Sequence, residues 1–272
     1  MIIGTEPLNL RLTLIDSAQC FRWTLQGQRY GCVLYGHPVW LWETPQGIAA
    51  EGEIDLAALR QYLDLERDYD AIAGEYDNIP VARQAMTLCP GLRVLNQPPW
   101  EALVSFILSA NNNVARIRGL CDALCRHFGR AWAKDLYSFP TPEQLANANE
   151  DELRALKVGY RAPYLIGTAR RVLEGFPLED LRHMDYEKAH AALTSLPGVG
   201  DKVADCVLLF GCGQTSAFPV DVWVEKLLRC WFDVKGKTRA ALLKEARALL
   251  GEHAGLLQQF LFHAARMGMI EV

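Results

Sequence analysis

Hydrophobic and polar positions alternate near the start of the chain, as in strands that bury one face. The alternation covers residues 8–15, and β-branched and aromatic residues continue the bias over 30–35 and 39–42. Gly-His-Pro at 36–38 fits a turn between the last two segments. The pattern therefore predicts antiparallel hairpins in this region.

From residue 56 onward the hydrophobic positions recur at helical spacing, and this continues to the end of the chain. Candidate helices cover 100–110, 114–128, 160–173, 186–195, 202–210, 222–231, 237–250 and 253–267, and another follows Pro142. We predict an α+β protein in which an N-terminal antiparallel β module, residues 1–88, packs on a mainly helical body, residues 89–272.

The composition describes a globular chain: of 272 residues, 50% are hydrophobic and 22% charged. No apolar run approaches the roughly 20 residues of a membrane-spanning helix, and the first residues do not resemble a secretory signal. We expect a soluble intracellular protein, in the cytoplasm or nucleoid if the host is a bacterium.

Eight cysteines are scattered without any C-x-x-C pair, and none follows Cys230. This spacing excludes the usual zinc site and a C-terminal cysteine-bound iron–sulfur cluster, and buried reduced thiols are expected instead. We therefore expect no metal and no organic cofactor.

The net charge of −4 at first argues against nucleic acid as a partner. However, residues 1–88 carry 6 basic and 12 acidic residues, a balance of −6, whereas residues 89–272 carry 22 and 20, a balance of +2. Because a local basic patch decides phosphate binding, the total charge leaves DNA binding open.

Residues 196–205 join two predicted helices through Pro-Gly-Val-Gly. Pro197 ends the first helix, and Gly198 and Gly200 permit the positive φ angles of a very tight hairpin. Free N–H groups around Val199 and at the start of the next helix would suit a phosphate. This is the pattern of a helix-hairpin-helix DNA-binding element, although these four residues also fit an ordinary turn between core helices.

Two residues near this segment are candidates for catalysis. Lys202 falls in the first turn of the second helix, where the positive potential disfavours an ammonium group and so favours the nucleophilic amine. A surface lysine that contacts phosphate is the alternative. Asp221 stands before an apolar-periodic run, at the place of a helix N-cap, and its carboxylate could also stabilise positive charge on a sugar ring.

Five stretches resemble the helix-hairpin-helix base-excision glycosylases with a catalytic lysine, and among these the 8-oxoguanine DNA glycosylase/lyase family. The principal one is 197–206, Pro-Gly-Val-Gly-x-Lys-Val-Ala-Asp-Cys, with the aspartate of Pro-Val-Asp 19 residues after the lysine. The others are 19–23, 109–117, 159–164 and 258–262. Together they extend from the N-terminal strands to the last predicted helix.

The resemblance implies a bifunctional DNA glycosylase and AP lyase that flips out and excises 8-oxoguanine, preferentially opposite C. Lys202 would attack C1′ of the damaged nucleotide and form a Schiff base, with β-elimination to follow. Asp221 would stabilise the oxocarbenium-like sugar. The implied partner is duplex DNA, bound by a monomer, with Gly198, Val199 and Gly200 at a phosphate.

By the same resemblance, the flipped base lies between Cys206 and Phe262, and Gln258 reads its Watson–Crick edge. Phe210 replaces a more usual methionine at the pocket wall. A backbone carbonyl accepts the N7 hydrogen of 8-oxoguanine, usually from glycine, and here from Ala18. The added β-carbon could crowd the pocket or resist a positive φ. For Cys206, Gln258 and Phe262, core packing or a polar helix face is the alternative.

The resemblance also assigns residues to the opposite strand. Arg116 and Arg161 would read the orphaned cytosine, Asn111 would fill the vacated space and Tyr160 would wedge beside the orphan base. The alternatives are solvated helix-terminal arginines, a helix cap at Asn111 and core packing of Tyr160. Trp223 stands where many relatives carry a histidine thought to contact DNA.

Two other functions remain open at this point. A helix-hairpin-helix glycosylase for another oxidised base, such as an oxidised pyrimidine, usually carries a C-terminal cysteine cluster that this sequence lacks. A non-catalytic duplex-binding module would need the hairpin but not Lys202 and Asp221 together.

Overall fold

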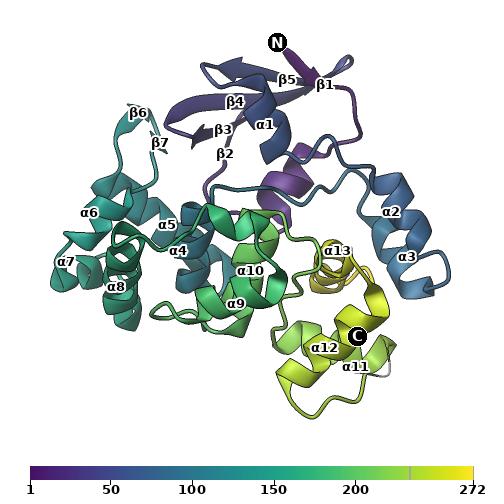
Figure 1. The fold of residues 1–272 in the computed structure, drawn as a ribbon. Coiled ribbons are helices and arrows are strands. Elements are labelled where there is room, and N and C mark those ends of the chain that lie inside the picture. Colours follow the sequence, from purple (N-terminus) through teal and green to yellow (C-terminus); the bar gives the residue numbers. More distant parts are fainter. Residues whose placement is uncertain (233, 272) are drawn as a thin grey trace.

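The computed structural model describes residues 1–232 and 234–271 and consists of an antiparallel sheet and a helical body (Figure 1). The five strands have the order β1-β5-β4-β3-β2, and every neighbouring pair is antiparallel. They are β1 (Ile2–Gly4), β2 (Thr24–Gln26), β3 (Arg29–Leu34), β4 (His37–Thr44) and β5 (Gly47–Gly52), followed by α1 (Leu56–Tyr62). The α+β class predicted from the sequence is confirmed.

The turn between β3 and β4 lies one residue earlier than expected. Tyr35 and Gly36 both have positive φ, at 50° and 81°, and form a two-residue hairpin turn. His37 and Pro38, which we placed in the turn, belong to β4 and pair with Leu34 and Val33. Turns of this hand match the twist of the strands that they connect.

The predicted strand at 8–15 is wrong, because this segment is helical and contains a π-helix, η1 (Leu12–Asp16). Asn9 Oδ1 accepts a hydrogen bond from Leu12 N over 2.9 Å and so starts the helix. The alternating leucines face two directions: Leu10 and Leu14 enter the core of the sheet module, whereas Leu12 enters the core of the helical body. Alternation here reflects a helix buried between two cores rather than a strand with one buried face.

The helical body contains the helices that the sequence predicted, most within two residues. They are α4 (Pro99–Ser109), α5 (Val114–Phe128), α6 (Pro142–Ala146), α8 (Ala162–Leu173), α9 (Tyr186–Thr194), α10 (Asp201–Cys212), α11 (Val222–Trp231), α12 (Arg239–Leu250) and α13 (Ala254–Arg266). The short helix α7 (Glu150–Ala155) was not predicted. Two short 3-10 turns, η2 (Gly159–Arg161) and η3 (Asp180–His183), precede α8 and α9. A small hairpin that we did not expect, β6 (Ala131–Ala133) with β7 (Leu136–Tyr137), interrupts the helices.

Packing does not divide the chain at residue 88. The helices α2 (Tyr69–Glu75) and α3 (Pro80–Leu88) precede that boundary, yet Ile72, Tyr76 and Ala82 belong to the core of the helical body. Tyr76 also donates its hydroxyl to the carbonyl of Leu250 over 2.8 Å. The core around the sheet draws mainly on residues up to Leu65.

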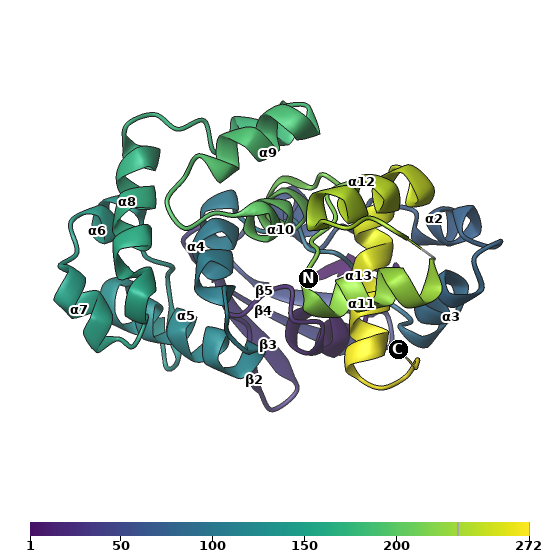
Figure 2. The ribbon, with the colours of Figure 1, turned by 90° about the horizontal axis from the view of Figure 1, so that it is seen from below.

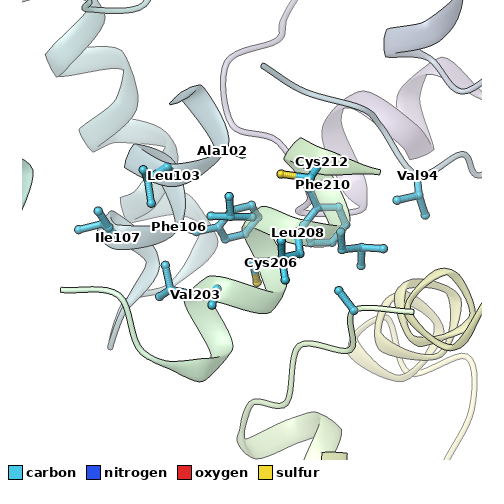
Figure 3. Packing of buried hydrophobic residues seen from close by; sticks show 14 of the residues in the cluster. Val94, Ala102, Leu103, Phe106, Ile107, Val203, Cys206, Leu208, Phe210 and Cys212 are labelled. Carbon is cyan, nitrogen blue, oxygen red and sulfur yellow. The ribbon is translucent and has the colours of Figure 1, made fainter. Parts of the chain in front are cut away.

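Helix α10 lies at the centre of the body, between α4 and α13 in both views (Figures 1 and 2). Every residue from Val203 to Cys212 is buried. Figure 3 shows the packing against α4, where the rings of Phe106 and Phe210 stack with centroids 5.3 Å apart. This packing fixes the N-terminal end of α10, where Lys202 is located. In the part of the chain that the structure describes, no helix has the length and apolar character to cross a bilayer.

Candidate active site

The hairpin before α10 is a tight turn with its two glycines in different conformations. Gly198 has a φ of 76°, and a Cβ at this position would lie 2.7 Å from the side chain of Tyr164. Gly200 is extended, serves as the N-cap of α10 and has nothing within 4 Å of a built Cβ. Val199 is buried, and its N–H donates to the carbonyl of Leu196 over 3.2 Å, so the free N–H group that we expected at this residue is not present. The exposed helix start at Gly200 is the part of the hairpin that a phosphate could approach.

Lys202 lies in the first turn of α10, and its amine is held by an uncharged partner. Its Nζ donates to Ser109 Oγ over 3.1 Å, while the Ser109 hydroxyl donates to the carbonyl of Phe106 over 2.7 Å. The same Nζ lies 5.2 Å from the centroid of the Phe106 ring. These contacts orient the side-chain nitrogen, and among the described residues no carboxylate forms an ion pair with it.

Asp221 is the N-cap of α11, as expected, and its Oδ1 accepts a hydrogen bond from Val224 N over 2.8 Å. Lys202 and Asp221 both line one cavity of about 990 Å³. Other lining residues come from the hairpin, from α4, α9 and α12, and from the N- and C-terminal parts of the chain; they include Ala18, Phe106, Ser109, Asn111, Tyr186, Gly198, Gly200, Asp205, Arg247 and Phe262. The structure thus brings the two candidate catalytic residues to one site.

The expected base-binding residues divide between the cavity surface and the layer behind it. Ala18 and Phe262 line the cavity. Ala18 has a φ of 61°, so the backbone here does adopt the conformation that alanine resists. Gln258 is buried on α13, and its Oε1 has no hydrogen-bond partner among the described residues. An unpartnered buried amide oxygen points to a missing donor.

Cys206 lies one turn after Lys202 and is buried beneath the cavity. Burial raises the pKa of its thiol to about 11, against the opposing effect of the nearby Lys202. Phe210 does not line the cavity, because it lies in the core, stacked against Phe106. The side chain of Trp223 lies outside what the structure describes.

The residues expected at the opposite strand form a cluster beside the cavity. Tyr160 is 48% exposed, and its hydroxyl contacts Asn111 Nδ2 and the carbonyl of Ala110, both at 3.4 Å. The alternative of core packing for Tyr160 is therefore wrong. Asn111 has a φ of 50° and caps no helix; the cap of α5 is Asn113.

The two arginines of this cluster differ in their surroundings. Arg116 is exposed in the first turn of α5. Arg161 is only 4% exposed, stacks its guanidinium on the Tyr160 ring at 4.4 Å, and donates to the carbonyls of Ala110 and Val158. The alternative of solvated helix ends therefore fits Arg116 but is wrong for Arg161.

Two functional features were missed from the sequence. Ser109, which holds Lys202, opened one of the family-like stretches but received no role. Asp205, three residues after Lys202, is buried and accepts the Tyr186 hydroxyl over 2.7 Å. Burial raises the pKa of the Asp205 carboxyl to about 7. An aspartate within the apolar run 203–210 was the available signal, because such a carboxyl needs a buried partner.

Two family models match this chain, one after the other along the sequence. Residues 104–252 match the HhH-GPD superfamily of base excision DNA repair proteins, and residues 1–103 match the N-terminal domain of 8-oxoguanine DNA glycosylase. An N-glycosylase/DNA lyase of Saccharomyces cerevisiae is 39% identical over 191 residues, which cover 63% of this chain and 50% of the relative. A probable N-glycosylase/DNA lyase of Methanothermobacter thermautotrophicus is 34% identical over 66% of each chain. The match thus spans about half to two thirds of the length of these curated relatives.

Among solved structures, the 8-oxoguanine glycosylase/lyase of Clostridium acetobutylicum, in complex with double-stranded DNA containing cytosine opposite 8-oxoguanine, superposes with a TM-score of 0.89 at 30% identity. This similarity covers 97% of this chain and 93% of that one. From these matches, together with the hairpin, the lysine and the aspartate at one cavity, we conclude that the chain belongs to the HhH-GPD superfamily of base excision DNA repair proteins and, within it, to the 8-oxoguanine DNA glycosylase family.

Proposed function

We propose that this protein is a DNA glycosylase and AP lyase that removes 8-oxoguanine from duplex DNA, preferentially opposite C. The observation that carries the proposal is the geometry of Lys202, whose amine is held by the Ser109 hydroxyl in the cavity that Asp221 also lines. The named activities and the bound DNA of the relatives agree with this proposal.

In the proposed reaction, the lysine amine attacks C1′ of the damaged nucleotide. The glycosidic bond breaks, and its electron pair leaves with the base, which takes up a proton. The sugar ring then opens to a Schiff base, loss of a C2′ proton breaks the C3′–O bond, and water releases the lysine. The amine of Lys202 is the nucleophile of the first step, and none of the steps needs a cofactor.

Asp221 supports the step in which positive charge develops on the sugar. Its Oδ1 accepts a hydrogen bond from Val224 N at the N-terminus of α11, which holds the carboxylate in place. A preorganised negative charge beside an oxocarbenium-like sugar stabilises the transition state more than the ground state.

Recognition of the lesion depends on a base that has left the helical stack. The side chains of Phe262 and Cys206 would enclose the ring of the flipped base. Burial favours the uncharged form of the Cys206 thiol, which suits contact with the ring. Gln258 Oε1, without a partner in this structure, would accept from the Watson–Crick edge. The Ala18 carbonyl would accept the N7 hydrogen that distinguishes 8-oxoguanine from guanine, and Phe210 would support the pocket through Phe106.

Opposite-base preference would come from the cluster around Tyr160. Arg116 is free to present donors to O2 and N3 of cytosine. Arg161 would have to exchange its carbonyl partners for the base, and until then it holds the Tyr160 ring. Tyr160 would separate the orphan base from its neighbour, and Asn111 would fill the space left by the flipped nucleotide.

Borohydride trapping on duplexes with 8-oxoguanine opposite each of the four bases tests this proposal. We expect a covalent adduct that Lys202→Gln abolishes, and fastest excision opposite C. An adduct formed only with an oxidised pyrimidine would support another glycosylase, and no adduct with any lesion would support a binding module. Equal rates opposite all four bases would contradict the roles of Arg116 and Arg161.

A further inference from the structure

A second hollow of about 820 Å³ lies between α5 and the end of α7, at the left of Figure 2. We call it the α5–α7 groove, and its lining residues are Arg116, Gly119, Leu120, Ala123, Arg154, Ala155, Leu156, Lys157 and Gly159. Three of these side chains are cationic and none is acidic. The cavity around Lys202 differs, because Glu187, Asp201, Asp205 and Asp221 line it together with its cations. The α5–α7 groove therefore suits an anionic partner.

The cations of the groove are available to a ligand to different degrees. Arg154 is paired with Glu150 on its own helix. Arg116 and Lys157 are exposed, and within the described ranges neither side chain makes a hydrogen bond or an ion pair. Two cations thus face the groove with no hydrogen-bond or ion-pair partner in the part of the chain that the structure describes.

Lys157 occupies this place in an unfavourable backbone conformation. It directly follows the C-cap of α7, its N–H donates to the carbonyl of Arg154 over 2.9 Å, and its φ is 67°. Glycine or asparagine is the usual residue at a left-handed position after a helix. A lysine here costs conformational energy, and no side-chain hydrogen bond or ion pair with the described residues compensates for it, which favours a role toward a ligand.

The position of the groove indicates which anionic ligand it would bind. Gly159 lines it, and the next residue is Tyr160, whose hydroxyl contacts Asn111 and Ala110. Asn111 and Ala110 line the cavity of Lys202. The contact between Tyr160 and Asn111 therefore connects the lining of the candidate active site to the residue that follows the cationic groove, and we call this contact the ridge.

We propose that the α5–α7 groove binds the phosphate backbone of the DNA strand opposite the damaged base, with Lys157 as a phosphate contact. This inference rests on the proposed function. When the ridge separates the two strands, the damaged nucleotide enters the cavity of Lys202, and the complementary strand passes over the groove beside Arg116. Phosphate contacts of this kind fix the register of the protein on the duplex without reading sequence.

Binding of a duplex that holds a tetrahydrofuran abasic-site analogue opposite C tests the proposal. Lys157→Gly and Lys157→Asn remove the charge and tolerate the positive φ, so both variants should melt at or above the wild-type temperature. We expect their Kd to rise about threefold to tenfold at about 0.1 M salt, and the slope of log Kd against log salt to fall by about 0.9. Lys157→Arg should restore both values.

Three comparisons distinguish the possible outcomes. Lys134→Gly removes one positive charge from the exposed turn between β6 and β7, and it should leave the affinity for the duplex unchanged. If Lys134→Gly lowered this affinity as much as Lys157→Gly, the effect would come from net charge alone, and the proposal would be overturned. The affinity for the damaged strand alone, without its complement, should not change in Lys157→Gly. If this affinity fell as much as that for the duplex, the damaged strand and not its complement would lie in the groove, and the proposal would be wrong. If the wild-type protein excises 8-oxoguanine but Lys157→Gly binds like wild type, only the groove assignment fails. If the wild-type protein neither excises nor is trapped, the proposed function fails.

Discussion

The amine of Lys202 donates to the hydroxyl of Ser109, which in turn donates its own hydrogen to a backbone carbonyl. The serine oxygen can therefore act only as an acceptor toward the lysine. An acceptor in this position orients the side-chain nitrogen of Lys202 through one N–H.

Ser109→Ala should lower the single-turnover rate of excision about fivefold, because a net hydrogen bond contributes about 1 kcal/mol. DNA affinity and melting temperature should change little, since the loss is confined to the orientation of Lys202. Ser109→Thr retains the hydroxyl and should recover most of the rate. An equal loss in both variants would indicate a packing defect and contradict the positioning role.

Asp221→Asn should separate the structural role of this residue from its chemical one. Asparagine caps a helix about as well as aspartate, so thermal stability should remain close to that of the wild-type protein. The negative charge is lost, and we expect excision to slow by about 10²-fold or more. Single-turnover kinetics and a melting curve measure the two effects. Unchanged excision would show that Asp221 is only a cap.

The two glycines of the hairpin should respond differently to a methyl group. Gly198→Ala combines a positive φ with a Cβ placed 2.7 Å from Tyr164, and should destabilise the fold by about 1–3 kcal/mol. Gly200→Ala meets nothing within 4 Å and keeps a negative φ, so it should cost only about 0.5 kcal/mol, because alanine is a poorer N-cap than glycine. Because Gly200 is the open helix start, its variant should still weaken binding to duplex DNA. Denaturant melts and duplex titrations measure both properties, and equal stability of the two variants would contradict this account.

The buried carboxyl of Asp205 should make the stability of the fold depend on pH. Its pKa is raised to about 7, mainly by burial, whereas an unfolded aspartate titrates near 4. The folded state therefore holds a proton that the unfolded state has lost, and the contribution of Asp205 to stability falls as pH rises from about 4 to about 7. The Tyr186 hydrogen bond and Arg247 oppose this effect, and Asp201 adds to it.

Asp205→Asn cannot ionise and should remove that part of the pH dependence. Relative to the wild-type protein, the variant should gain stability between about pH 5 and about pH 8, by at least about 1 kcal/mol. Urea melts of both proteins at several pH values measure the difference. A difference that stays constant across this range would show that Asp205 is ionised throughout.

The helices were largely predictable from the sequence because their signals are local. Asn113 caps α5 and Asp221 caps α11, so both begin where a capping residue precedes an apolar-periodic run. The hairpin at 197–200 was also predictable, because proline fixes its own φ and glycine permits positive φ angles wherever these residues occur. The period of residues 8–15 misled us, because alternate burial in two different cores imitates a strand.

The surroundings of side chains depended on contacts between distant segments. The partner of Lys202 lies 93 residues away in the sequence, and Arg161 is buried by carbonyls that include one at Ala110, 51 residues away. Motifs pointed to these segments but not to hydrogen-bond partners. The roles of Arg116, Arg161, Gln258 and Phe262 toward DNA stay predictions that the experiments above address.

The loop that carries Ala18 is attached to the far end of the chain. Gln259 on α13 donates to the Ser17 carbonyl over 2.8 Å, and Arg266 donates to that of Asp16. Within the same loop, Gln19 bonds to the carbonyl of Arg93. Replacing Gln259 and Arg266 together by alanine would therefore loosen the segment whose Ala18 carbonyl we propose to recognise the lesion, while Lys202 kept its partners. Such a double variant should still react at abasic sites yet have lost its discrimination between oxidised and intact bases.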